Sequence, residues 1–227
     1  MQENTQELIN YLSGFVSDRR KQRLHDVLQE RMRHMTVVLE DVYQAHNASA
    51  VLRSCDCFGV QDVHFIENRN NFKISEDVSM GSTQWLSIYK YREKENNTKK
   101  CLQDLKSKGY RIVATTPHKD DCTISELDVS KPFALVFGTE IDGITQDVFE
   151  VADEFVKIPM YGFTESFNIS VSAALCMYEL TTRIRKQNIP YQLSEKEKEE
   201  IYLEWLKASI SKPDLIIKDY YSKKGSF

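Results

Sequence analysis

Residues Thr36–Ile66, TVVLEDVYQAHNASAVLRSCDCFGVQDVHFI, decide the fold class. A β-rich run opens this stretch, a helical pattern fills its middle, Gly59 stops the helix, and a second β-rich run closes it. In order, the pattern predicts a strand over 36–40, a loop over 41–47, a helix over about 48–58 and a strand over 62–66. Consecutive strands joined by a helix are typical of a parallel sheet.

The same alternation continues along the chain. It predicts helices over about 96–108, 145–152 and 169–186, and strands over 110–114, 133–137 and 154–158. The helix over 169–186 is apolar and rich in small residues before it turns basic. We therefore predict an α/β fold with a mostly parallel sheet and helices on both faces.

Helical extensions flank this predicted core. Apolar residues at near-helical spacing predict an amphipathic basic helix over 16–35. A charged helix over 195–210 follows the core, and the last residues, 220–227, are expected to be frayed. The predicted domains are an N-terminal helical extension over 1–35, a core domain over 36–187 and a C-terminal helical extension over 188–227.

The composition fits a globular chain of 227 residues, enough for one domain with some helical elaboration. No apolar stretch approaches the roughly 20 residues of a membrane span. The start, Met1–Asn10, lacks the basic and apolar regions of a secretory signal, so we expect a cytoplasmic protein. The five cysteines include no Cys-x-x-Cys and no nearby paired histidines, so we expect reduced thiols buried as small hydrophobes, and no metal site.

Positive charge is concentrated near the N-terminus, although the formal net charge of the chain is −4. Between Arg19 and Arg33, six Lys or Arg residues stand against two acids, which makes this helix a candidate phosphate-binding face. The basic end of the helix over 169–186 would extend that face, and a solvated helix end explains it equally well. The candidates for phosphate contact are Arg19, Arg20, Arg23, Arg31, Arg183 and Arg185.

The first polar motif, Asn47-Ala-Ser-Ala-Val-Leu-Arg53, lies where the loop after the first predicted strand enters its helix. Functional residues of open α/β sheets gather at the carboxyl ends of strands, so Asn47 and Arg53 are candidate site residues. Two structural interpretations stay open, with Asn47 as a helix N-cap and Arg53 as an ordinary solvated arginine. The two positions lie about 240° apart on an ideal helix, so they share a site only if Asn47 lies outside the first turn.

The second motif, Leu135–Gly143, reads LVFGTEIDG and ends a strand in an acidic loop between two glycines. It matches neither Gly-x-Gly-x-x-Gly nor a P-loop, and Glu140 and Asp142 would repel a pyrophosphate. Such a loop suits a ligand with a positive or neutral portion. Turn formation also explains Gly138 and Gly143 without any ligand.

The third motif, Ile158–Ser172, reads IPMYGFTESFNISVS. Pro159 cannot extend a strand ladder, so a loop follows it and a helix begins near Asn168. Four polar residues crowd this helix start, Ser166, Asn168, Ser170 and Ser172. One N-cap would explain one of them. The other hydroxyl and amide groups, with the open backbone N–H donors of the helix start, suit a small polar ligand or a ribose.

In this order and at these separations, the three motifs resemble those of the SPOUT superfamily of RNA methyltransferases, and within it the TrmH family of tRNA guanosine 2′-O-methyltransferases. The resemblance covers most of 16–210, including the basic N-terminal and charged C-terminal helices. It implies a deep trefoil knot in the C-terminal part of the sheet. It also implies S-adenosylmethionine as cofactor, no metal, and a homodimer in which one subunit's Arg53 completes the site around the other's cofactor.

The resemblance also assigns site residues. The cofactor pocket would be lined, largely through backbone, by Thr116, Gly138, Ile158, Met160 and Ile169. Glu140 and Asn168 would brace that pocket. The implied catalytic set is Asn47, Arg53, Glu140, Ser166 and Asn168. The chain departs from the family at Thr115-Thr-Pro117, where relatives often have histidine and leucine, and this departure bears on Thr116.

Methyl transfer to a ribose is an in-line displacement in which the attacking hydroxyl loses its proton. The arginine side chain has a pKa above about 12 and does not act as a base. We therefore predict that Arg53 binds the adjacent phosphate bidentately and stabilises the developing oxyanion, while Ser166 and Asn168 orient the ribose. His46 is an alternative base, and a hydrogen-bonded loop histidine is its structural interpretation.

The short N-terminal extension favours tRNA as the substrate. About 35 residues precede the first predicted strand, fewer than the separate RNA-binding domain that family members acting on ribosomal RNA commonly carry. By resemblance, we expect methylation of the D-loop guanosine at position 18. A ribosomal RNA 2′-O-methyltransferase, sharing every catalytic residue, and a non-catalytic RNA-binding protein that lacks cofactor affinity are the alternatives.

Overall fold

The computed structural model describes residues 2–70, 81–93, 96–117, 119, 122–139 and 143–224. Contacts divide the chain into two compact units. The sheet unit comprises residues 32–191, and the helical unit comprises residues 1–31 together with 192–227.

A seven-stranded sheet forms the centre of the described sheet unit, in the order β3-β2-β1-β6-β4-β7-β5. Every pair of neighbouring strands in it is parallel, which confirms the predicted α/β fold. The strands are β1 Met35–Glu40, β2 Asp62–Ile66, β3 Ser87–Tyr91, β4 Arg111–Thr115, β5 Cys122–Thr123, β6 Phe133–Phe137 and β7 Glu154–Lys157.

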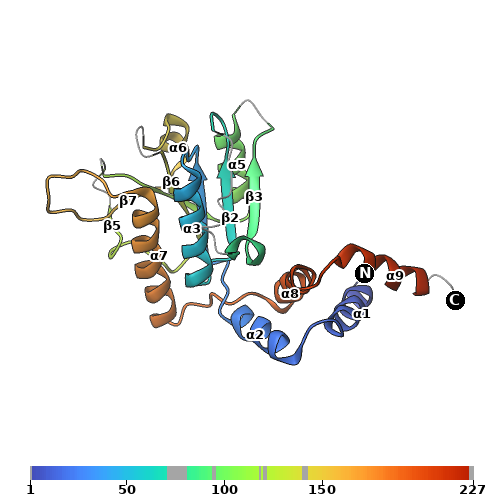
Figure 1. Cartoon of the computed structure of the whole chain (residues 1–227). Helices are drawn as coiled ribbons and strands as arrows, with labels where there is room; N and C mark the ends of the chain where they lie inside the picture. Colours follow the sequence, from blue (N-terminus) through green and yellow to red (C-terminus); the bar gives the residue numbers. More distant parts are fainter. Residues whose placement is uncertain are drawn as a thin grey trace. The chain divides into compact units, whose positions relative to one another are not determined.

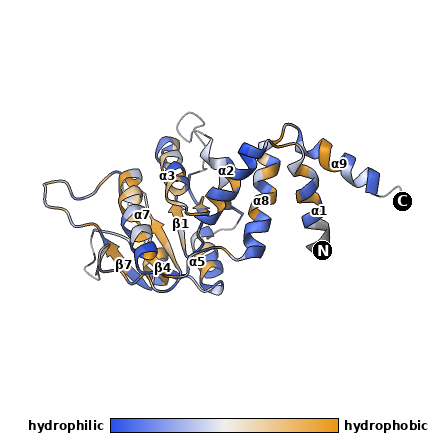
Figure 2. Ribbon diagram, turned by 90° about the horizontal axis from the view of Figure 1, so that it is seen from below, coloured by the Kyte–Doolittle hydropathy of each residue, from blue (hydrophilic) through white to orange (hydrophobic). Residues whose placement is uncertain are grey.

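The sequence pattern does not predict β3 or β5, the two edge strands. A central strand of a parallel sheet is covered on both faces and therefore reads as an apolar run. β1 reads MTVVLE and is buried throughout, whereas β3 reads SIYKY and is only partly buried. Figure 2 shows the apolar character of the central strands β1 and β4 in orange.

Helices cover both faces of the sheet, as predicted. One face is covered by α3 Ala45–Phe58 and α7 Ile169–Lys186, which contact each other (Figure 1). The other face is covered by α5 Asn97–Ser107 and α6 Gln146–Val151. The short helix η1 Ser82–Trp85 contacts α3. Alternate residues of β1 supply both cores, because side chains of a strand alternate between faces. Val37 and Leu39 pack in the core of α3 and α7, and Val38 packs in that of α5 and α6.

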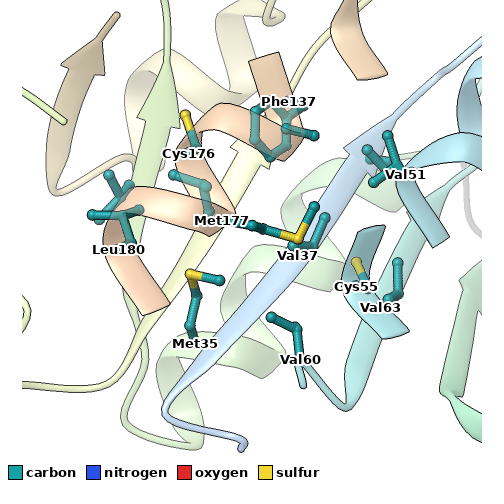
Figure 3. Packing of buried hydrophobic residues seen from close by; sticks show 14 of the residues in the cluster. Met35, Val37, Val51, Cys55, Val60, Val63, Phe137, Cys176, Met177 and Leu180 are labelled. Carbon is teal, nitrogen blue, oxygen red and sulfur yellow. The ribbon is translucent and has the colours of Figure 1, made fainter. Parts of the chain in front are cut away.

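The larger core lies between β1 and the two helices α3 and α7 (Figure 3). Met177 of α7 and Val51 of α3 both lie beside Val37 of β1 in this view. Met177 is fully buried, so its truncation to alanine would cost about 2–5 kcal/mol of stability. This packing fixes the start of α7, where the third sequence motif lies.

The helical unit consists of α1 Gln2–Ser13, α2 Asp18–Gln29, α8 Glu195–Ser209 and α9 Pro213–Lys224. The helix expected over 16–35 is shorter than predicted: Ser17 caps α2, and the helix ends at Gln29. Leu28 is buried in this unit, whereas Met32 and Met35 belong to the core of the sheet unit. The apolar residues of 16–35 therefore belong partly to the helical unit and partly to the sheet unit.

The two terminal extensions, predicted as separate segments, meet in the helical unit. The hydroxyl of Tyr11 on α1 donates to Asp219 Oδ2 on α9 at 3.1 Å, and the Tyr11 and Tyr220 rings lie 5.0 Å apart. The fraying expected from residue 220 is wrong as far as Lys224, where α9 ends, and residues 225–227 lie outside the described residues. Among the described helices, none has the length and apolar character needed to cross a membrane.

Candidate active site

A pocket of about 280 Å³ lies at the carboxyl ends of β4, β6 and β7, beside the first turns of α7. This is the edge at which open α/β sheets bind ligands. The structure brings together here all five residues predicted to hold the cofactor, Thr116, Gly138, Ile158, Met160 and Ile169. Ser166 of the predicted catalytic set lines the same pocket. The convergence is a property of the fold, and the roles of these residues stay predictions.

Hydrogen bonds hold the three strand ends together under the pocket. Thr115 Oγ1 donates to the Val136 carbonyl at 2.9 Å, and the Thr116 N–H donates to the Val156 carbonyl at 3.1 Å. The Thr115-Thr-Pro117 sequence, which departs from the family pattern, thus retains the strand pairing. Pro117 follows directly and also lines the pocket.

Gly138 is required by close backbone packing. A Cβ atom at this position would lie 2.1 Å from the Gly143 carbonyl oxygen and 2.4 Å from the Ile144 nitrogen. The approach is fixed by paired hydrogen bonds, from the Thr139 N–H to the Gly143 carbonyl at 2.8 Å and from the Gly143 N–H to the Thr139 carbonyl at 3.2 Å. Gly143 itself has a φ of +69°, which disfavours other residues. Both glycines therefore shape the pocket wall.

Asn168 and Asn47 form a hydrogen bond across 121 residues of sequence. Asn168 caps α7, and its Oδ1 accepts from the Ser170 N–H at 2.9 Å and from the Ser170 hydroxyl at 2.6 Å. Its Nδ2 donates to Asn47 Oδ1 at 3.2 Å. The Asn168 side chain thereby ties the start of α7 to α3.

The N-cap interpretation of Asn47 is wrong, because α3 begins at Ala45 with Gln44 as its N-cap. Asn47 lies inside the first turn and is buried, and its Nδ2 donates to Gln44 Oε1 at 3.1 Å. Arg53 is exposed on α3 and does not line the pocket of its own chain. His46, the alternative base, is also exposed and outside the pocket. Asn47 and Arg53 therefore do not share a site within one chain.

Glu140, predicted to brace the pocket, lies outside the described residues, as does Asp142 of the same motif. The structure adds pocket residues that the motifs did not single out, among them Lys157, Phe149 and Cys176. Lys157 follows directly from its position at the end of β7, whereas Phe149 and Cys176 come from helices and carry no such signal.

The cysteines depart from the prediction at two positions. Cys57 is exposed and Cys122 is partly buried, whereas Cys55, Cys101 and Cys176 are buried as expected. Burial raises the pKa of Cys176 to about 12, so this pocket residue is a neutral thiol near pH 7 and a poor nucleophile. No cluster of three or more His, Cys, Asp or Glu side chains suited to a metal is found among the described residues.

The arginines predicted to contact phosphate fall into three groups, which are exposed, buried and half-buried. Arg19, Arg20 and Arg23 are exposed on α2. The prediction for Arg31 is wrong. This residue is 1% exposed and its guanidinium lies over the Trp205 ring at 5.2 Å, which removes it from any phosphate-binding surface.

Arg183 and Arg185 are half-buried on α7 and bond to the protein backbone. Arg183 donates to the Ile124 and Leu127 carbonyls at 2.8 and 2.7 Å, and Arg185 donates to the Phe58 carbonyl at 3.2 Å. Their guanidinium groups serve packing here, and we do not place them in the phosphate-binding face.

Known proteins resemble this chain in sequence and fold. The model of the SpoU rRNA Methylase family matches residues 34–178. The chain is 42% identical to a tRNA (guanosine(18)-2′-O)-methyltransferase of Borreliella burgdorferi, over 90% of this chain and 92% of that protein. It is 31% identical to the enzyme of the same name from Escherichia coli K12, over 76% and 73% of the two chains.

The fold matches that of a solved relative. The crystal structure of the A. aeolicus TrmH/SpoU tRNA modifying enzyme superposes with a TM-score of 0.77 at 32% identity, covering 86% of this chain and 98% of that one. The family match covers more than half of the chain and contains all three sequence motifs. The pocket and these similarities together show that the chain belongs to the SpoU/TrmH family of RNA methylases.

Proposed function

We propose that this protein transfers a methyl group from S-adenosylmethionine to the 2′-hydroxyl of guanosine 18 in tRNA. The observation that carries the proposal is the convergence of the second and third motifs on one pocket at the carboxyl edge of the sheet. The Borreliella burgdorferi and Escherichia coli relatives, which span most of this chain, are tRNA (guanosine(18)-2′-O)-methyltransferases, and this favours the same nucleotide here. We also propose that the chain carries the trefoil knot implied by its family.

The pocket residues fit this cofactor. Ile158, Met160 and Ile169 provide apolar contacts for an adenosine, and Gly138 allows the Gly143–Ile144 backbone to pack closely as a wall of the pocket. Lys157 and Glu165 line the pocket with charges of opposite sign, which suits the carboxylate and ammonium of an amino acid. When bound, the cofactor supplies a methyl group activated by a positively charged sulfur.

The protein's part in the reaction is to position the ribose and to stabilise charge. We assign contact with the ribose to Ser166, because this residue lines the pocket. Asn168 acts through the start of α7, since its side chain is already bonded to Ser170 and Asn47. Arg53 remains the proposed phosphate and oxyanion ligand, and it must come from a second subunit because it lies outside the pocket of its own chain.

A second copy of the chain fits the outer face of α7. This face carries three apolar side chains at helical spacing that are 39–60% exposed, Val171, Leu175 and Tyr178, and Phe167, just before the helix, is 43% exposed. A contiguous exposed apolar stripe marks an interaction surface, and a symmetric dimer covers the same stripe on both copies. We propose that a dimer formed through this stripe places the partner subunit's Arg53 at the pocket, because α3, which carries Arg53, packs beside α7.

The dimer is tested by Leu175→Glu, which places a charge in the stripe. We expect this variant to sediment as a monomer and to lose methyl transfer, while Leu215→Glu, on the exposed face of α9, leaves the mass and activity unchanged. A monomeric wild type with full activity would exclude a role for the partner's Arg53.

The activity is tested with unmodified tRNA transcripts and methyl-labelled cofactor, followed by mapping of the modified nucleotide. We expect label at guanosine 18, and none in a transcript that carries adenosine there. A ribosomal RNA fragment is the comparison substrate, because the family model is described as one of rRNA methylases. Incorporation into that fragment and not into tRNA would overturn the proposed substrate, and no binding of the cofactor at millimolar concentration would overturn the enzyme itself.

A further inference from the structure

Glu40, the last residue of β1, has a buried carboxylate whose hydrogen bonds the mechanism does not use. The side chain is 0% exposed, and no described cation forms an ion pair with it. A buried carboxylate is costly unless donors satisfy it. The position of those donors therefore shows what the side chain organises.

Three donors converge on the Glu40 carboxylate. Oε1 accepts from the Thr98 hydroxyl and from the Thr145 hydroxyl, each at 2.7 Å. Oε2 accepts from the Thr145 N–H at 3.0 Å. Hydrogen bonds to a charged acceptor are roughly twice as strong as neutral ones. Glu40 thus links the first turn of α5 to the residue that precedes α6.

The Thr145 side chain bonds to Glu40 and does not cap its own helix. It is the N-cap residue of α6, a position at which a threonine hydroxyl ordinarily accepts from the helix backbone. No such side-chain bond is made, and the hydroxyl donates to Glu40 instead. The interaction across 105 residues of sequence has replaced the local cap.

The segment held by Thr145 is a wall of the pocket. Gly143 and Ile144 directly precede Thr145, and both line the pocket. Gly143 also receives the close approach of Gly138, which leaves no room for a Cβ. A displacement of Thr145 would therefore shift the wall against which Gly138 packs.

We propose that Glu40 is a positioning residue, which fixes Thr145 and thereby the Gly143–Ile144 wall of the S-adenosylmethionine pocket. The inference rests on the proposed function, since it takes this pocket to be the cofactor site. Neighbouring Asp41 is a natural contrast: its buried carboxylate accepts from the Asn68 and Arg69 N–H groups at 2.7 and 2.8 Å, in a loop outside the pocket.

The two threonines provide a matched test. Thr145→Val and Thr98→Val each remove one hydroxyl donor at the same distance from the same oxygen, but only Thr145 adjoins the pocket wall. Calorimetric titration with S-adenosylmethionine is expected to show about 10-fold weaker binding for Thr145→Val, roughly the effect of one charge-assisted hydrogen bond. We expect less than about 2-fold for Thr98→Val and recovery of affinity in Thr145→Ser. Thr98→Val should lower the melting temperature at least as much as Thr145→Val, because the Thr98 hydroxyl also accepts from Asn68 Nδ2 at 2.8 Å.

Glu40→Gln and Asp41→Asn complete the experiment. Glu40→Gln is expected to weaken the binding of S-adenosylmethionine and to leave tRNA affinity unchanged. Its effect on cofactor affinity should not add to that of Thr145→Val, because the two residues act as one unit. Asp41→Asn should leave cofactor affinity unchanged. Where Glu40→Gln fails to fold, the threonine pair decides by itself.

Two outcomes separate this inference from the proposed function. Equal cofactor affinities for Thr145→Val and Thr98→Val, with tight binding by the wild type, would show that Glu40 supports the fold and not the pocket. Absence of binding by the wild type in the same titration would instead reject the proposed function.

Discussion

The carboxyl edge of the sheet and the exposed face of α2 both carry polar side chains, but they hold them in opposite ways. At the sheet edge, Asn168 bonds to Ser170 and Asn47, and Glu40 accepts three hydrogen bonds. On α2, Arg19 and Arg23 are exposed to water. Fixed side chains can select one geometry, whereas exposed charges attract a polyanion without specifying its orientation. We therefore propose that the chemistry takes place at the sheet edge and that the exposed arginines of α2 capture RNA.

The same contrast occurs among the arginines of the sheet unit. Arg183 is held by two backbone carbonyls, whereas Arg53 is exposed on the neighbouring helix. A guanidinium bound to its own backbone has fewer donors left for an RNA phosphate. Substitutions should therefore separate residues that support the fold from residues that act on substrate.

The largest effect is expected at Gly138, where any side chain would overlap the backbone of Gly143 and Ile144. Gly138→Val should weaken S-adenosylmethionine binding by on the order of 100-fold or more, equivalent to about 3 kcal/mol. Gly162→Ala is the matched control in the third motif, because a Cβ there meets nothing within 4 Å. Calorimetry compares the two, and wild-type affinity in Gly138→Val would contradict the assignment of the pocket.

Arg53→Lys comes next. A lysine keeps the charge but cannot bind a phosphate bidentately, so we expect kcat to fall about 100-fold with unchanged cofactor affinity. Arg183→Lys should instead lower the melting temperature and leave kcat within about 2-fold, because its donors face backbone carbonyls. Single-turnover kinetics with saturating tRNA distinguish them, and near-wild-type turnover of Arg53→Lys would rule out the bidentate role.

The buried His64 and the exposed His25 should affect the pH dependence of stability differently. Burial lowers the pKa of His64 on β2 to about 3, whereas unfolded histidine titrates near 6.5. Between these values the unfolded chain binds a proton that the folded chain does not, so stability should fall as the pH drops from about 6.5 toward 3. The slope contributed by this residue is up to about 1.4 kcal/mol per pH unit.

Urea unfolding at pH 7, 6 and 5 measures that slope. His64→Phe should flatten it, since phenylalanine preserves the stacking on Tyr89 without a titrating group. His25→Gln, on the exposed surface of α2, is the control and should leave the slope as in the wild type. Equal slopes in the wild type and His64→Phe would mean that other groups govern the loss of stability in acid.

The smallest effect is expected on α2. Replacing Arg19 and Arg23 by alanine should raise KM for tRNA only several-fold and reduce its dependence on salt, because we propose that each exposed arginine makes one screened phosphate contact. Arg31→Ala should destabilise the helical unit instead, since it removes a buried side chain packed on Trp205. A loss of kcat in the Arg19 and Arg23 variant would contradict the proposal that α2 only captures RNA and that the sheet edge carries the chemistry.

Local sequence patterns were enough to predict the fold class, and the family resemblance was enough to predict residues that line the pocket. Alternating apolar runs and helical patterns report burial between neighbours in sequence, and α7 has its predicted bounds, Ile169–Lys186. The family resemblance implied the five cofactor residues, and they meet in one pocket because parallel strands bring the carboxyl ends of β4, β6 and β7 to one edge. Weak local patterns hid β3 and α9, because an edge strand and a helix without buried residues leave little periodic signal.

Contacts between distant parts of the chain establish which polar side chains are held by hydrogen bonds. The bond between Asn168 and Asn47 spans 121 residues, and that between Glu40 and Thr145 spans 105, so no local pattern reports either one. Arg31 looked like its exposed neighbours in sequence until the packing on Trp205 buried it. The physical reason is that periodicity records the face of one element, whereas burial and hydrogen bonding depend on what a distant part of the chain places against that face.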